Sequence, residues 1–303
     1  MPRSPRWWLE NKQEVLREET KAGMHMRTDT IESIILYHSR RGMHILREKL
    51  PEKYCKEAAQ DILSWERGNI LLTTGFYVAG YAETDGPVGT VMLAQALEKL
   101  GFHAVIVTDI YCKGFFEPEG IETVYMKNTD GEEFCTELVG KYQPVGMISI
   151  ERCGRNIYDD YANMRGVSIK EKTAPVDMLF ASYQGKIPTI GVGDGGNEIG
   201  MGNMQEVIQE KLSLVPCKVC VDRLVIATVS NWGAYGIVAY LALLCKDKSL
   251  FPAYQWVASY LKRIVALGSV DGVSKENVPS VDGFPAEVEK EIMTDLTVAV
   301  CGA

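Results

Sequence analysis

Short apolar runs alternate with helical patterns along most of the chain. Residues 69–74 form an apolar run that predicts a buried strand, and residues 87–100 carry apolar side chains at the spacing of one helix face. Residues 104–109 predict the next strand. A strand, a helix and a second strand within about 40 residues are typical of a βαβ unit, whose strands pair in parallel.

The alternation continues to the end of the sequence. It predicts strands over 121–126, 145–150, 187–190 and 223–229, and helices over 131–141, 175–183, 203–213, 234–245, 252–266 and 285–300. About six strands, nearly all followed by helices, indicate an α/β protein with an open, doubly wound, Rossmann-like and mostly parallel sheet. Such folds bind ligands beyond the carboxyl ends of the strands.

Residues 1–66 predict helices and no strand. We expect an N-terminal helical segment over 1–66 that packs on an α/β domain over 67–303. Isoleucines at helical spacing share a predicted helix face with His38, so we expect this histidine to be packed rather than to bind a ligand. No residue of this segment is a candidate for chemistry.

Charge and composition exclude several classes of function. The 303 residues have a net charge of −8, which argues against general binding to nucleic acid or to an anionic membrane surface. No apolar run reaches the ~18 residues that span a bilayer. The basic start lacks the apolar region of a secretory signal. We expect a cytoplasmic protein, or one of the mitochondrial matrix if the source is eukaryotic.

The eight cysteines are scattered, and one pair, Cys217 and Cys220, has the spacing of a motif. A single C-x-x-C without a second pair or a nearby histidine is weak evidence for zinc or for a redox pair. Reduced thiols in a cytosol-like compartment are the simpler interpretation.

A glycine-rich stretch over 191–203 is the most unusual part of the sequence, with six glycines in thirteen residues. Backbone amides can converge there on an anion, although Asp194 and Glu198 compete with any anion bound nearby. A solvated connection is the alternative. Residues 191–196 match G-x-G-x-x-G, but this dinucleotide pattern usually opens the first βαβ unit, so NAD binding is disfavoured. The sequence contains no P-loop.

Polar residues follow the predicted strands where they end. Because the carboxyl ends of parallel strands meet at one edge of a sheet, we expect these side chains to converge on a single site. The candidates are Thr84, Asp85, Asp109, Glu151, Arg152, Arg155, Asp194, Asn197, Glu198, Ser230 and Asn231.

Each candidate has more than one reading. Arg152 and Arg155 suit a substrate carboxylate or phosphate, or form salt bridges with Glu151 or with Asp159 and Asp160. Asp85, Asp194 and Glu198 either hold a divalent cation or shift one another's pKa into the range for acid–base chemistry. Asp85 alone suits the N-terminal cap of the following helix.

Five motifs together resemble the D-glutamate cyclase C-terminal-type domain family. They are Thr74-Gly-Phe76, Glu83-Thr-Asp-Gly-Pro87, Ile150-Glu-Arg-Cys-Gly-Arg155, Gly191-Val-Gly-Asp-Gly-Gly-Asn-Glu-Ile-Gly200 and Val229-Ser-Asn-Trp-Gly233. The resemblance covers most of the chain, from near residue 30 to near residue 300. It implies conversion of D-glutamate into 5-oxo-D-proline and water. A larger family enzyme carries a preceding hydro-lyase-like domain, which nothing in this sequence matches.

The resemblance also implies roles for the candidate residues. Arg152 or Arg155 is expected to hold the substrate α-carboxylate, and Asp194 or Glu198 to accept a proton from the amine. Asp85 is expected to protonate the departing oxygen, and the amides of Gly195 and Gly196 to stabilise the oxyanion. The remaining substrate-binding candidates are Thr84, Glu151, Asn197, Ser230 and Asn231. No cofactor is expected to be required, with Mg²⁺ as the alternative.

Two other functions fit the same residues. One is a Mg²⁺-dependent enzyme for a small phosphorylated or acidic metabolite, with the metal held by Asp85, Asp194 and Glu198. The other is a non-catalytic module that binds an acidic metabolite for a partner enzyme. The expected partner is a small acidic substrate similar to D-glutamate, with no nucleic acid and no membrane. A second copy of the chain or a hydro-lyase-like domain is the expected protein partner.

Overall fold

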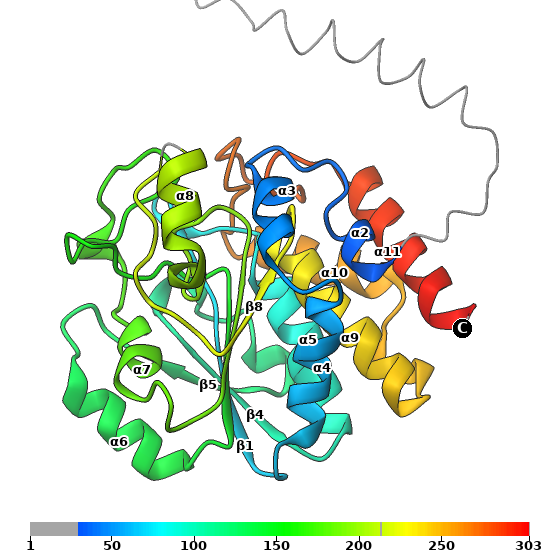
Figure 1. Ribbon diagram of the computed structural model, residues 1–303, viewed down its shortest axis with the longest axis horizontal. Helices are drawn as coiled ribbons and strands as arrows, with labels where there is room; N and C mark the ends of the chain where they lie inside the picture. Colours follow the sequence, from blue (N-terminus) through cyan, green and yellow to red (C-terminus); the bar gives the residue numbers. More distant parts are fainter. Residues whose placement is uncertain (1–29, 213, 303) are drawn as a thin grey trace, which may run out of the picture. The chain divides into compact units, whose positions relative to one another are not determined.

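Six parallel strands form the central sheet of the computed structural model, which describes residues 30–212 and 214–302 (Figure 1). Their order across the sheet is β5-β4-β1-β6-β7-β8, which is that of a doubly wound Rossmann-like fold. The strands are β1 (Asn69–Thr73), β4 (His103–Thr108), β5 (Glu122–Tyr125), β6 (Gly146–Ile150), β7 (Thr189–Gly193) and β8 (Arg223–Ile226). The predicted fold class is confirmed.

The strand order reverses between β1 and β6, which pair with Thr73 opposite Ser149. The chain builds β4 and β5 on one side of β1, then returns to place β6, β7 and β8 on the other. The connections after β1 and β6 therefore leave the sheet in opposite directions. A crevice opens between them at the carboxyl edge, where ligands of such folds bind.

Helices cover both faces of the sheet (Figure 1). One face carries α4 (Tyr54–Ser64), α5 (Pro87–Lys99) and α9 (Ser230–Cys245), with α10 (Tyr254–Ala266) and α11 (Ala286–Cys301) packed outside α5 and α9. The other face carries α6 (Glu132–Tyr142) and α7 (Asp177–Ser182). Shorter helices are α2 (Ile31–Ile34), α3 (Met43–Leu46) and α8 (Gln205–Lys211).

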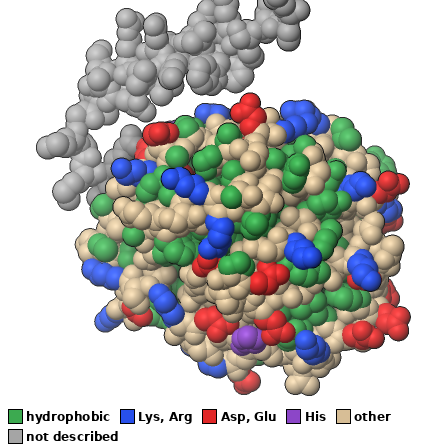
Figure 2. All heavy atoms as spheres, turned by 180° about the vertical axis from the view of Figure 1, so that it is seen from behind, with side chains coloured by type: hydrophobic (Ala, Val, Ile, Leu, Met, Phe, Trp, Pro, Cys, Tyr) green, Lys and Arg blue, Asp and Glu red, His purple; other side chains and the backbone are tan. Residues whose placement is uncertain are grey.

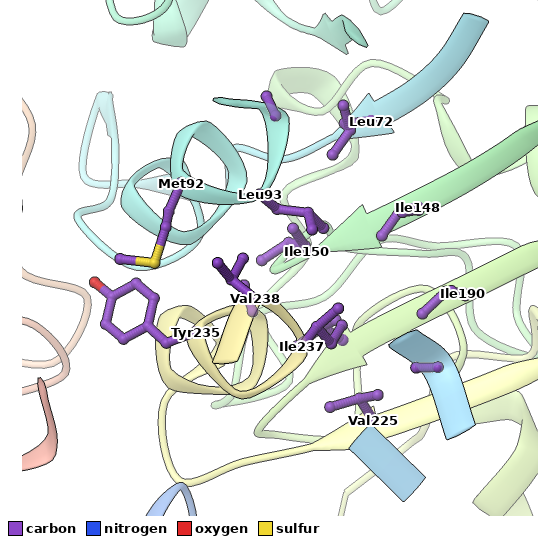
Figure 3. Close-up of a cluster of buried hydrophobic side chains, with 14 of the residues drawn as sticks. Leu72, Met92, Leu93, Ile148, Ile150, Ile190, Val225, Tyr235, Ile237 and Val238 are labelled. Carbon is purple, nitrogen blue, oxygen red and sulfur yellow. The ribbon is translucent and has the colours of Figure 1, made fainter. Parts of the chain in front are cut away.

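The core lies where α5 and α9 meet the strands (Figure 3). Leu93 points from α5 toward Ile148 and Ile150 of β6, and Ile237 points from α9 toward the strand that carries Ile190. Every residue of α9 from Ser230 to Ala242 is buried, as expected for a helix that is apolar on all sides.

Glycine allows α5 and α9 to approach closely. A Cβ atom at Gly89 would lie 2.8 Å from the Cβ of Ala234 and 3.0 Å from the Cα of Asn231. The first turns of the two helices are therefore in direct contact beside the crevice.

Several predicted boundaries are wrong around the glycine-rich stretch. Gly191 and Gly193 belong to β7, so the loop itself begins at Asp194. The helix predicted from residue 203 begins at Gln205, and the Asn203 side chain bonds the backbone of Val221 instead of capping that helix.

Two other connections also differ from expectation. Ser230 and Asn231 form the first turn of α9 rather than a loop. The predicted loop after β1 contains a hairpin of β2 (Tyr77–Val78) and β3 (Tyr81–Ala82). Its two turn residues, Ala79 and Gly80, have φ angles of 51° and 102°, as the mirror-image turns of tight hairpins require.

The N-terminal segment is described only from residue 30, so its predicted helices over 1–29 lie outside the described residues. From Ile31 onward the chain forms one compact unit, in which α4 packs on α9 and β8. His38 is exposed and pairs with Glu291, so the prediction of a packed histidine is wrong. The helix ends at Ile34, before it reaches His38.

The described surface mixes charged and apolar side chains. Figure 2 shows acidic and basic groups interspersed on the face seen from behind, so neither sign dominates there. No helix among residues 30–212 and 214–302 combines the length and the apolar character needed to cross a bilayer.

Candidate active site

A cavity of about 230 Å³ lies at the carboxyl ends of β1 and β6. Part of its wall is apolar, with Phe76 and Val78 from the β1 connection and Ile169 from the segment after β6. Three acidic side chains and three basic ones also line it, namely Glu83, Glu151, Glu198, Arg41, Arg165 and Lys275. The cavity therefore lies in the crevice that the strand order creates.

Six carboxylic acids gather at the cavity, three of them in its lining, in what we call the acidic cluster. They are Glu83, Asp85, Glu151, Asp194, Glu198 and Asp282, all buried. They come from the connection after β1, from the ends of β6 and β7, and from the loop between α10 and α11. The cluster thus combines three predicted catalytic residues, Asp85, Asp194 and Glu198, with three further acids.

Glu151 reaches the cluster through an unusual backbone conformation. It directly follows β6 and has a φ angle of 47°, in the left-handed region that non-glycine residues rarely adopt. Its Oε2 accepts a hydrogen bond of 2.6 Å from the hydroxyl of Ser230. Strained residues of this kind concentrate at functional sites, so Glu151 is a strong candidate for chemistry.

Asp85 is held by the first turn of α9. Its carboxylate accepts hydrogen bonds of 2.7–2.8 Å from the amides of Gly86, Ser230 and Asn231. We predicted that Asp85 caps the helix that follows it, α5, and this is wrong. The N-cap of α5 is Gly86, and Asp85 caps α9 instead. Its fixed place is behind the cavity rather than in its lining.

The glycine-rich loop folds around its own glutamate. Glu198 accepts hydrogen bonds of 2.9 Å from the amide of Gly195 and 2.8 Å from that of Gly196. A Cβ atom at Gly193 or Gly195 would lie 2.8 Å from a carboxylate oxygen of Glu198. Both amides proposed for an oxyanion hole are thus engaged by an acidic side chain of the loop itself.

Arg41 supplies positive charge from an unexpected part of the chain. It lies between α2 and α3, and its Nη2 donates to both Asp194 and Asp282. The N-terminal segment, in which the sequence indicates no candidate for chemistry, thus contributes a cation to the acidic cluster. Within the described ranges, Arg41 is the basic side chain recorded in ion pairs with the acidic cluster.

Burial raises the pKa of several carboxyls of the cluster. It raises the pKa of Glu83, Glu151 and Asp194 well above their ordinary values, with added repulsion between neighbouring acids and an opposing attraction from Arg41. The pKa of Asp85 is raised to about 7, mainly by burial and then by the charge of Asp282. Burial and mutual repulsion thus favour the protonated forms of these acids.

Glu198 differs from the other acids. Burial raises its pKa, whereas the amide of Gly196, the charge of Arg41 and the amide of Gly195 oppose that rise. The cavity lining thus contains carboxyls whose protonated forms are favoured by burial and one whose ionised form also accepts backbone hydrogen bonds, and carboxyls in such different environments can act as acid and as base.

Three members of the cluster could share a metal ion. Oxygen atoms of Asp85, Glu151 and Asp194 lie within 4.8 Å of one another, and Asp194 Oδ1 has no hydrogen-bond partner among the described residues. Glu151 takes the place that the sequence prediction gave to Glu198. Cys217 and Cys220 are free thiols outside this group.

The predicted substrate-binding arginines are engaged elsewhere. Arg152 is fully buried and donates to Asp109 at 2.7 Å and to the carbonyl oxygens of Gly75 and Ala174. Arg155 pairs with Asp177 at 2.8 Å. Their salt-bridge partners are therefore neither Glu151 nor Asp159 and Asp160.

Some of the remaining candidates bond other parts of the fold, and one lines the cavity. Thr84 donates to the carbonyl oxygen of Ser280 at 2.7 Å and does not line the cavity. Asn197 lines the cavity, and its amide group donates to the carbonyl oxygen of Ala162. Asn231 bonds the first turn of α5.

A second, larger cavity of about 490 Å³ lies beyond β4 and β5, beside Asp109 and Tyr111. It contains no member of the acidic cluster. The smaller cavity is the candidate active site because the titratable groups and the strained backbone of Glu151 meet there.

The fold and this cavity define an α/β protein with a carboxylic-acid-lined site at the reversal point of a parallel sheet. The chain belongs to the D-glutamate cyclase-like family, whose C-terminal region matches residues 31–297. This confirms the resemblance seen in the sequence motifs.

Two known proteins are similar to parts of the chain. Human "D-glutamate cyclase, mitochondrial" is 35% identical over 204 residues, which cover 58% of this chain and 33% of that protein. The match thus spans a third of that relative's length. A crystal structure of an actinorhodin polyketide ketoreductase variant with NADPH has a TM-score of 0.25 and 12% identity, covering 76% of this chain and 90% of that one.

Proposed function

We propose that this protein cyclises D-glutamate to 5-oxo-D-proline with release of water. Its family and the name of its human relative support this reaction. The observation that carries the proposal is that three buried carboxyls, Glu83, Glu151 and Glu198, line one small cavity. Ring closure needs one group that takes a proton from the ammonium and another that gives a proton to the departing oxygen.

Glu198 is our candidate for the base. The sequence left the choice between Asp194 and Glu198, and Glu198 lines the cavity whereas Asp194 does not line it and is bonded to Arg41. The amides of Gly195 and Gly196 favour its ionised form, which is the form that accepts a proton.

Glu151 is our candidate for the acid, in place of Asp85. It lines the cavity, and burial raises its pKa well above the ordinary value, which favours the protonated form that an acid needs. Asp85 lies behind the wall and accepts three amide hydrogen bonds, so we assign it a positioning role.

The protons balance over one cycle with these two groups. Glu198 takes a proton from the substrate ammonium, and the neutral amine attacks the γ-carboxyl carbon while Glu151 protonates a γ-carboxyl oxygen. The nitrogen, now positively charged, returns a proton to Glu151. Glu198 then protonates the hydroxyl group, which leaves as water as the amide forms. Both glutamates end in their starting states.

The direct test is turnover by the purified protein. D-glutamate and L-glutamate are supplied separately, with and without a chelator, and 5-oxoproline is measured by chromatography. We expect product from D-glutamate. No product with a raised melting temperature would indicate a non-catalytic binding module, and no product without stabilisation would point to another substrate.

A metal-assisted enzyme acting on a small phosphorylated or acidic metabolite is the second candidate. The grouping of Asp85, Glu151 and Asp194 around a common point, with an unpartnered oxygen on Asp194, favours it. A divalent cation there would offset the repulsion between the acids. Titration with Mg²⁺ should then raise the melting temperature of the wild type but not of Asp194→Asn, and chelation should abolish turnover.

We further propose a cytoplasmic or mitochondrial-matrix location, and association with a second copy or with a hydro-lyase-like domain. The human relative's name supports the matrix option. Imaging of the tagged chain in its own cell type tests the first point. Light scattering, alone and with a separately expressed hydro-lyase-like domain, tests the second.

A further inference from the structure

We propose that Arg165 and Lys275 form an anion subsite at the mouth of the cavity, which takes the α-carboxylate of the substrate. This inference rests on the proposed function and deepens it, because it names how an acidic amino acid is recognised. The sequence had assigned this task to Arg152 or Arg155, which the fold uses elsewhere.

The three acids of the lining and two of its three cations occupy different depths of the cavity. Its three acids, Glu83, Glu151 and Glu198, are buried, whereas Arg165 and Lys275 are exposed at its mouth. An amino acid has the complementary arrangement, with an ammonium group beside a carboxylate. The cavity therefore favours one orientation, with the amine inward and the α-carboxylate outward.

Arg165 and Lys275 are free to bind an anion. Among the described residues, neither side chain forms an ion pair or a hydrogen bond, whereas Lys218 is paired with Asp159 and Lys141 with Glu122. Arg41, the third cation of the lining, forms ion pairs with two buried acids and offsets part of their negative charge. Recognition of a carboxylate is thus left to the two cations at the mouth.

Arg165 is carried on an ordered turn. The side-chain oxygen of Asn163 accepts hydrogen bonds from the amides of Arg165 and Val167, and Gly166 supplies the positive φ angle that the turn needs. A fixed backbone lowers the entropy lost when a side chain binds its ligand.

Lys275 is carried on a loop built around Asp271, which is fully buried. The carboxylate of Asp271 accepts hydrogen bonds from the amides of Val273, Ser274 and Gly283. Lys275 has a φ angle of 62°, which lysine rarely adopts in a relaxed loop. The loop geometry thus holds this lysine at the cavity at a conformational cost.

The reaction fixes which carboxylate lies at the mouth. The γ-carboxyl must meet a buried proton donor and lose its water shell, so it belongs beside Glu151 in the floor. The α-carboxylate stays ionised throughout and is best matched by solvent-exposed cations. A substrate whose α-carboxylate is masked as an amide should therefore lose this recognition.

The test compares Arg165→Gln, Lys275→Gln and the double variant in steady-state cyclisation of D-glutamate and of its α-amide, D-isoglutamine. Each substitution removes a charge-assisted contact, so we expect about a tenfold rise in KM for D-glutamate per substitution with little change in kcat. KM for D-isoglutamine should be high in the wild type and unchanged by either substitution. Lys172→Gln, an exposed lysine beside the larger cavity, is the control for general surface charge.

Unchanged KM for D-glutamate in the double variant would overturn the subsite, as would an equal rise in Lys172→Gln. If the wild type does not cyclise D-glutamate, the proposed function fails. Calorimetric titration with D-glutamate then still tests whether Arg165 and Lys275 form the subsite. Binding that is lost in the double variant and kept in Lys172→Gln supports it. Equal binding by all variants, or no binding by the wild type, rejects it.

Discussion

Asp85 and Asn231 cap each other's helices. Asp85 precedes α5 and accepts hydrogen bonds from amides in the first turn of α9, including that of Asn231 at 2.7 Å. Asn231 lies in α9, and its side-chain oxygen accepts from the amides of Gly86 and Gly89 at the start of α5. The two N-termini are therefore fixed against each other where the acidic cluster begins.

Asn231→Ala should lower the free energy of unfolding by about 2 kcal/mol, because it leaves the buried amide of Gly89 without an acceptor and leaves that of Gly86 with Asp85 alone. Urea denaturation measures this change. Asp247→Ala is the matched control, since Asp247 caps an exposed turn through the amide of Ser249. The control should cost less than about 1 kcal/mol. An equal loss of unfolding free energy in the two variants would mean that burial of the reciprocal cap does not increase its contribution to stability.

The sheet could be predicted because each buried parallel strand is a short apolar run, and β1 and β6 show this plainly. The boundary of β7 could not, because Gly191 and Gly193 read as loop residues in the sequence. They are glycines in a strand because close neighbours, including the Glu198 side chain beside Gly193, leave no room for Cβ atoms. Tertiary packing, and not local conformational preference, therefore explains why glycine occupies these two strand positions.

Residues of the candidate site could be predicted only where the sheet topology alone brings them together. Asp85, Glu151 and Asp194 follow different strands, and the parallel sheet brings them together. Arg41 and Asp282 come from connections outside the βα units, and Asp282 precedes a glycine in what the sequence presents as an ordinary turn. Their convergence depends on long-range packing that carries no local signal.

Stability should fall as the pH rises through neutrality. The pKa of Asp85 is raised from 3.8 to about 7, so the folded protein binds this proton more tightly than the unfolded chain. The resulting stabilisation is complete below the unfolded pKa and is lost as the pH rises through about 7. Glu83 and Glu151 shift in the same direction. Urea denaturation should therefore give a larger unfolding free energy at about pH 5 than at about pH 8.

Asp85→Asn provides the control for this dependence. The oxygen of the asparagine side chain still accepts from the amide of Asn231, and the side chain does not titrate, so the fall in unfolding free energy between about pH 4 and about pH 7 should be shallower than in the wild type. Parallel curves for the two proteins would show that Asp85 does not contribute to the pH dependence.

Glu198→Gln should lower kcat for 5-oxoproline formation by about 10²–10⁴-fold, because glutamine keeps the side-chain size but accepts no proton. The variant should also lose the acidic limb of the wild-type pH–rate profile. Glu210→Gln, at an exposed helix position, is the control and should leave both unchanged. A variant that keeps the wild-type pH profile would remove Glu198 from the role of base.

Arg41→Met should destabilise the protein through the charges it leaves behind. Asp194 and Asp282 would remain buried without their cation, and breaking such a pair costs about 3–5 kcal/mol. Arg40→Met is the control, since Arg40 is exposed and stacks on the ring of Phe284 at 4.3 Å. Its loss should cost about 1 kcal/mol or less.

Adding Asp194→Asn separates charge from packing in this comparison. If the cost of Arg41→Met arises from an uncompensated carboxylate, the double variant should regain part of the lost unfolding free energy, giving a coupling of about 1–3 kcal/mol in a double-mutant cycle. Strictly additive losses would show that Arg41 acts through its packed stem instead. The charge-based outcome would also mean that a segment outside the βα units, between α2 and α3, sets the electrostatic state of the acidic cluster.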